Sequence, residues 1–129
     1  MSKFALAVFL FAVLTPAVAG ACSTLSLGNV GVRGMTTDGK LNHYQINGVV
    51  TNGGANQASN TLQAIDIYKG STKLDSKSVP PLKAGQSFTF TYISDRSSDA
   101  GSGTSHLRFV LDDKNGSLCT APAPAMVTF

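Results

Sequence analysis

Hydrophobic and polar residues alternate with a period of two along most of the chain after residue 20. The clearest case is the segment 87–92, where Phe88, Phe90 and Tyr92 alternate with serine and threonine. Successive side chains of a strand point to opposite faces of a sheet, so this alternation predicts strands that are buried on one face. About seven such segments occur, and we expect them near residues 25–32, 43–50, 61–68, 74–79, 87–92, 106–111 and 126–129.

Turn-forming residues separate these segments. Asp38-Gly39, Lys69-Gly70 and Asn115-Gly116 all lie between two alternating runs, and such residues adopt the positive φ that tight turns require. The first predicted strand also contains Gly28, where we expect an irregularity. No segment has the stripe of an amphipathic helix, and the chain has no Glu. We therefore predict an all-β fold, an immunoglobulin-like antiparallel β-sandwich of about seven strands, with an open-ended barrel as the alternative.

The first 19 residues have the pattern of a secretory signal peptide. Lys3 is followed by an uninterrupted apolar run over residues 4–14, which is shorter than the ~20 residues that span a bilayer. Ala17 and Ala19 then place small residues at the two positions that a signal peptidase reads. We predict a signal peptide at 1–19 and a single domain at 20–129. The mature protein is then secreted or periplasmic, with no transmembrane span after signal cleavage.

The two cysteines lie near the two ends of the predicted domain. In an oxidising compartment Cys22 and Cys119 form the obvious disulfide, because the chain has no other cysteine. Closing so long a loop is worth about 4–5 kcal/mol in the chain-entropy model. The alternative is that residues 19–22 act as a relaxed bacterial lipobox. Cys22 would then be a lipid anchor in the cell envelope and Cys119 a lone thiol.

Net charge and candidate catalytic groups narrow the function class. The formal charge of +3 is mild and scattered, so we expect no nucleic-acid partner. The only histidines, His43 and His106, alternate with apolar residues of predicted strands, and we expect them to be solvated surface residues. Paired carboxylates at Asp95 and Asp99, or at Asp112 and Asp113, lie in predicted polar turns. We therefore predict a non-enzymatic protein with no cofactor.

Two further clusters have a structural and a functional interpretation. Asp112, Asp113 and Asn115 offer hard oxygen ligands for calcium, but they lie in a predicted hairpin turn, which explains them without a metal. Four lysines gather around one predicted hairpin, and we interpret them as guards of an edge strand, with a weak electropositive contact surface as the alternative. These are Lys69, Lys73, Lys77 and Lys83.

The stretch from Ile46 to Asp112 carries an ordered set of motifs. These are an Asn-x-Gly turn at 52–54, Tyr-x-Gly at 68–70, Leu-x-Ala-Gly-x-Ser at 82–87 and a late strand that ends at Asp112. The set resembles the CARDB domain, the cell-adhesion-related module of bacterial surface proteins, and is similar to the FxLYD type of small bacterial domain. The resemblance implies an immunoglobulin-like sandwich and a binding or adhesion function.

Segment 95–104 is the longest predicted connection between strands. Rigid scaffolds carry binding residues on such loops, so we expect the contact with an unknown protein or glycan partner to lie here. The candidate contact residues are Asp95, Arg96, Ser97, Asp99 and Ser102.

Overall fold

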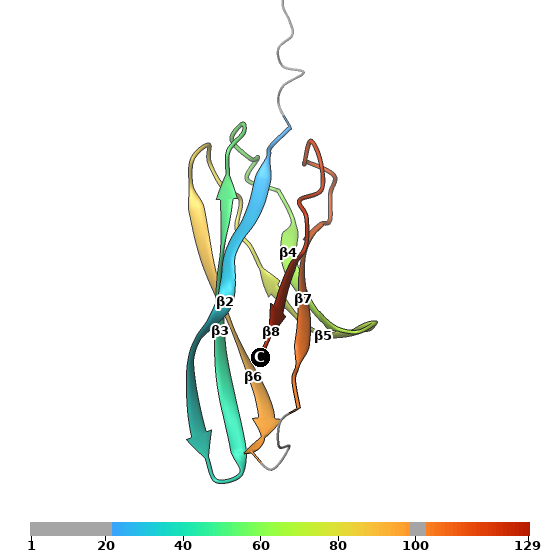
Figure 1. The fold of residues 1–129 in the computed structure, drawn as a ribbon. Helices are drawn as coiled ribbons and strands as arrows, with labels where there is room; N and C mark the ends of the chain where they lie inside the picture. The colour runs from blue at the N-terminus through green and yellow to red at the C-terminus, as the bar shows by residue number, and fades with distance from the viewer. Residues whose placement is uncertain (1–21, 99–102) are drawn as a thin grey trace, which may run out of the picture.

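A computed structural model describes residues 22–98 and 103–129, which form two packed antiparallel sheets (Figure 1). One sheet has three strands in the order β2-β3-β6, and the other has four in the order β5-β4-β7-β8. The predicted seven-stranded β-sandwich is confirmed. The predicted signal peptide at 1–19 lies outside the described residues. The strands are β2 (Leu25–Asp38), β3 (Leu41–Asn52), β4 (Gln63–Lys69), β5 (Thr72–Ser78), β6 (Ser87–Ser97), β7 (His106–Asp113) and β8 (Ala125–Thr128).

The core lies between the two sheets and is built from the alternating apolar positions. Ile46 of β3 and Phe90 of β6 meet Ile65 of β4 and Phe109 of β7, and all four are almost fully buried. The rings of Phe90 and Phe109 lie 5.8 Å apart between centroids. Burial of this apolar surface is the main force that holds the two sheets together.

Gly48 of β3 leaves room for the ring of Phe90, its cross-strand partner on β6. A Cβ atom at this position would lie 2.4 Å from Cζ of Phe90 and 2.9 Å from a methyl carbon of Val30. Neither neighbour can move away without disturbing the core, because a well-packed interior has little free volume. Glycine at position 48 is therefore a packing requirement of β3.

All three strands of the first sheet are longer than the alternation predicted. β2 continues to Asp38 and β3 begins at Leu41, so they form a long hairpin whose turn contains Gly39 at φ 61°. Near the turn, residues 33–38 of β2 and Leu41 of β3 are exposed, so polar residues occur on both faces there and the alternation is lost. The expected irregularity at Gly28 is present as a register shift between Gly28 and Gly31, with Asn29 at φ 53°.

The prediction that residues 95–104 form a loop is wrong at its start. Asp95, Arg96 and Ser97 belong to β6, where they pair with His43, Asn42 and Leu41 of β3. The long β2–β3 hairpin supplies this partner strand, which sequence alone did not reveal. Asp99 and Ser102 lie outside the described residues. Among the described residues, no helix is long and apolar enough to cross a membrane.

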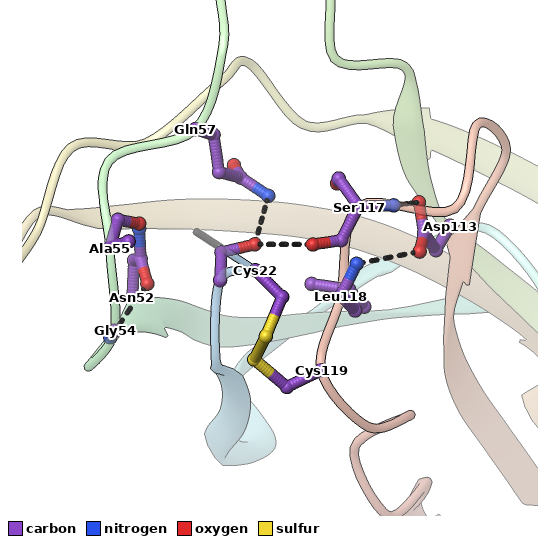
Figure 2. Close-up of a disulfide and its surroundings, with 10 residues drawn as sticks. Cys22, Asn52, Gly54, Ala55, Gln57, Asp113, Ser117, Leu118 and Cys119 are labelled. Atoms are coloured by element: carbon purple, nitrogen blue, oxygen red, sulfur yellow. Dashed lines mark hydrogen bonds between the residues drawn. A yellow bond between two sulfur atoms is a disulfide. The ribbon is translucent and has the colours of Figure 1, made fainter. Parts of the chain in front are cut away.

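The structure contains the Cys22–Cys119 disulfide, with the two Cα atoms 5.0 Å apart. The backbone reinforces it, because Ser23 N donates to Ser117 O at 3.1 Å and Cys119 N donates to Ser23 O at 2.9 Å. Figure 2 shows Asp113 beside this link, where its carboxylate accepts hydrogen bonds from Ser117 N and Leu118 N. The segment before β2 is thus tied to the connection between β7 and β8.

Candidate functional site

A cleft of about 460 Å³ lies between β6 and the edge of the four-stranded sheet. Its lining comes from β6, from the β4–β5 hairpin and from the segment that leads into β7, with no contribution from β3. It therefore lies on the side of β6 that faces away from β3. A concave site with mixed apolar and polar walls is the common form of a ligand pocket.

Three side chains give the cleft its apolar character. Leu74 is the unpaired residue of a bulge in β5, because the register shifts between the pairs Ile67–Asp75 and Tyr68–Lys73. The bulge leaves Leu74 43% exposed at the sheet edge. Tyr92 of β6 and the buried Leu107 of β7 complete this wall.

The Tyr92 side chain combines an apolar ring with a hydroxyl donor. Its ring meets Phe109 edge-on, with 6.4 Å between centroids, which fixes the ring against the core. Burial raises the pKa of the Tyr92 hydroxyl, and the carboxylates of Asp75 and Asp95 raise it further. The hydroxyl therefore keeps its proton at neutral pH and can donate a hydrogen bond to a ligand.

Arg96 is a rigid cation at one end of the cleft. Its guanidinium donates to the main-chain oxygen of Phe129 at 2.8 Å and to the Tyr44 hydroxyl at 3.1 Å. The same group lies over both aromatic rings, 5.2 Å from the centroid of Tyr44 and 5.8 Å from that of Phe129. Such cation–π contacts hold an arginine in place. Arg96, one of the predicted contact residues, is thus held by two hydrogen bonds and two aromatic rings.

Asp95 is hydrogen-bonded to His43, its cross-strand partner on β3. Both side chains lie on the outer face of the three-stranded sheet, and Asp95 also lines the cleft. The His43–Asp95 pair was not predicted, because the two residues are far apart in sequence and no local motif links them. His106 is also exposed, between the hydroxyls of Thr104 and Thr128.

Lys69 differs from the neighbouring lysines of the four-stranded sheet. Lys73 pairs with Asp66 at 3.7 Å, and Lys77 pairs with Asp75 at 3.5 Å. These two lie on β5, which is an edge strand as the lysine pattern predicted. Lys69 lines the cleft and forms no ion pair with any described residue. Its charge is therefore free to meet a ligand.

The side-chain oxygens of Asp112, Asp113 and Asn115, the candidate calcium ligands, bond to other groups of the protein. Asp112 pairs with Lys114 at 3.0 Å, and Asp113 accepts the two backbone N–H groups beside the disulfide. The Asn115 side chain accepts from Leu62 N and donates to Asn60 O. Within residues 22–98 and 103–129, no group of three or more potential ligand side chains is close enough to hold a metal ion.

A buried polar network at the disulfide end was not predicted from the sequence. Asn52 is fully buried; its side chain donates to Ala55 O and Leu82 O and accepts from Gly54 N. The amides of Gln57 and Gln63 bond each other reciprocally, at 2.9 and 2.7 Å. Gln57 also donates to Ser23 Oγ, next to the disulfide. Polar residues in loops and at strand ends are usually solvated, so no sequence signal marks Asn52 and Gln63 as buried.

No protein-family model, curated protein or solved structure matches this chain.

Proposed function

We propose that the chain is a non-enzymatic binding module that acts outside the cytoplasm and holds its ligand in the cleft beside β6. The observation that carries this proposal is the composition of the cleft. Its apolar wall of Leu74, Tyr92 and Leu107 adjoins a protonated hydroxyl and the unpaired cation of Lys69. An apolar surface supplies affinity, and a few fixed polar groups supply orientation.

The disulfide and the expected signal peptide support this compartment. Structural disulfides persist in oxidising compartments, which include the periplasm and the extracellular space. The resemblance to CARDB supports an adhesion-type role with a protein or glycan ligand. An envelope lipoprotein would need the Cys22 sulfur for a thioether, and in this structure that sulfur is bonded to Cys119.

Mass spectrometry of the secreted protein tests the compartment. We expect a mature chain that begins at Gly20 and a Cys22–Cys119 peptide that separates only after reduction. A diacylated Cys22 would overturn the disulfide assignment and establish the lipoprotein.

Binding measurements on two leucine variants test the cleft. The mature chain is probed with a glycan array and with a phage-displayed library of random linear peptides, and retained ligands are titrated. Leu74→Ser removes apolar contact from the cleft, so we expect about tenfold weaker binding. Leu62→Ser is the matched control, because Leu62 is also exposed but does not line the cleft. Equal affinity of the two variants would overturn the proposal.

A further inference from the structure

We infer that the ligand of this cleft is an extended polypeptide segment that adds to the free edge of β6 as a further strand. The inference rests on the proposed function, since it names the ligand class of the same site. In this binding mode the main chain of the ligand provides affinity, and pockets for alternate side chains provide specificity.

The unequal size of the two sheets leaves room for such a strand. β6 is the last strand of a three-stranded sheet that packs against a four-stranded sheet. The inward-facing Tyr92 and Ser94 of β6, together with Leu74 of β5, line the cleft. A strand added to β6 would lie about 4.8 Å away and would cover this exposed margin of the core.

Two hydrogen bonds show which backbone groups of β6 are available. Asn52 N donates to Gln86 O at 3.0 Å, and Ser98 N donates to Lys40 O at 2.8 Å. These bonds flank the β3–β6 ladder at its two ends. In an antiparallel pair, directly opposite residues alternate between hydrogen-bonded and non-hydrogen-bonded pairs. Both of these bonds join directly opposite residues, and in both the residue on the β6 side has an even number. The even-numbered residues of β6 therefore bond β3.

The odd-numbered residues of β6 direct their N–H and C=O groups away from β3. Thr89, Thr91, Ile93 and Asp95 thus form a row of free donors and acceptors along the cleft side of β6. An exposed strand edge of this kind is a template for pairing with another chain. These groups repeat at every second residue of β6, as do the N–H and C=O groups along one edge of an extended peptide.

The other edge of the same sheet is less suitable. β2 has register shifts between Gly28 and Gly31 and between Val32 and Gly34, which interrupt the even spacing of its free groups. β6 pairs with β3 without interruption from Thr51–Ser87 to Leu41–Ser97. Bulges on an edge strand discourage pairing, so the regular edge is the one open to a partner.

The walls of the cleft define the side chains that the peptide needs. Alternate side chains of an added strand point inward, toward Leu74, Tyr92 and Leu107, and should be apolar. Lys69 has no acidic partner among the described residues, so an Asp or Glu near that end of the peptide complements its charge. We therefore expect an extended and partly apolar segment of another protein, with an acidic residue at the end that lies near Lys69.

Amide hydrogen exchange on the wild-type mature chain tests the inference directly. Peptides enriched from the random library are synthesised and added to the isotope-labelled protein. We expect the amides of Thr89, Thr91 and Ile93 to exchange more slowly when the peptide is bound. Protection of β2 amides alone, or of no β6 amide, would overturn the inference.

A proline variant and its matched control test the main-chain contact. Thr91→Pro removes a free N–H without removing a bond to β3, and proline is tolerated where the N–H of an edge strand faces solvent. We expect at least about tenfold weaker peptide binding for this variant. Thr91→Ala loses the same side chain but keeps the N–H, so its affinity should equal that of the wild type. Equal affinity of both variants and the wild type would overturn the inference.

Other outcomes separate this inference from the proposed function. Glycans that bind the cleft, with peptides that do not, would overturn the strand and leave the binding module. Protection of β6 amides in a dimer of the free protein would identify a second copy as the occupant and overturn the inference. A chain that retains neither glycans nor peptides overturns both proposals.

Discussion

The disulfide end of the sandwich and the cleft beside β6 satisfy their polar groups in opposite ways. At the disulfide end, Asn52 and Gln63 are almost fully buried, and each makes several hydrogen bonds within the chain. Beside β6, a row of backbone groups and the Lys69 ammonium have no partner within the described chain. Buried polar groups must be paired internally, whereas a solvated edge can keep its groups for a ligand. The first end thus satisfies its polar groups within the chain, whereas the second leaves them for the ligand that we propose.

Loss of the disulfide should be the largest disruption of the closed end. The double variant Cys22→Ser and Cys119→Ser is expected to lower the free energy of unfolding by about 4 kcal/mol, because the unfolded chain is released from a long closed loop. Urea denaturation of the variant and of the wild type, each with and without reductant, measures the loss. Equal denaturation midpoints for the oxidised wild type and the variant would contradict this account.

Removal of the buried amide at position 52 should come next. Asn52→Ala leaves Gly54 N, Ala55 O and Leu82 O without this partner, and we expect a loss of about 3 kcal/mol in unfolding free energy. Asn56→Ala is the control, because the exposed Asn56 side chain makes one bond, to Ala84 N, in a neighbouring loop. The control should cost about 0.5 kcal/mol or less. Equal losses would show that burial of the network is unimportant.

A glycine pair compares the inner face of the three-stranded sheet with its outer face. Gly48→Ala forces a Cβ into the Phe90 ring, and we expect a loss of about 2 kcal/mol from overpacking. Gly34→Ala places its Cβ in open space and should change stability by under about 0.5 kcal/mol. Thermal unfolding followed by circular dichroism measures both. The contrast fails if Gly34→Ala costs as much as Gly48→Ala.

The smallest effect concerns an exposed ion pair on the four-stranded sheet. The hydrogen bond from Lys114 lowers the pKa of Asp112 below its ordinary value of 3.8, and burial partly opposes this shift. A lowered folded-state pKa gives stability that is present above the ordinary value and lost as the pH falls through the lowered one. Relative to Asp112→Asn, the wild type should therefore lose stability only in acid, below about pH 4.

Urea midpoints from neutral to acid pH measure this difference. Asp38→Asn, in the β2–β3 hairpin, is the matched charge control. An Asp112→Asn protein that loses stability in acid as steeply as the wild type would exclude the ion pair as the source.

The sequence predicted the sandwich because period-two alternation reports burial on one face, and all seven strands were located. It placed Asp95, Arg96 and Ser97 in a loop, because a strand end that is paired but solvated has no alternation to report. The cleft could not be predicted, since it depends on which strand ends each sheet. The Gln57–Gln63 pair was missed for a similar reason, because the loop that carries Gln57 meets the start of β4 only in the folded chain.

The reciprocal amide pair has a consequence for tolerance to acid and base. Asn52, Gln57, Gln63 and Ser23 hold the closed end together with amide, hydroxyl and backbone groups, none of which gains or loses a proton in ordinary media. The cross-link between Cys22 and Cys119 does not titrate either. This network of amides, hydroxyl and backbone groups therefore keeps one charge state while the pH of its surroundings changes.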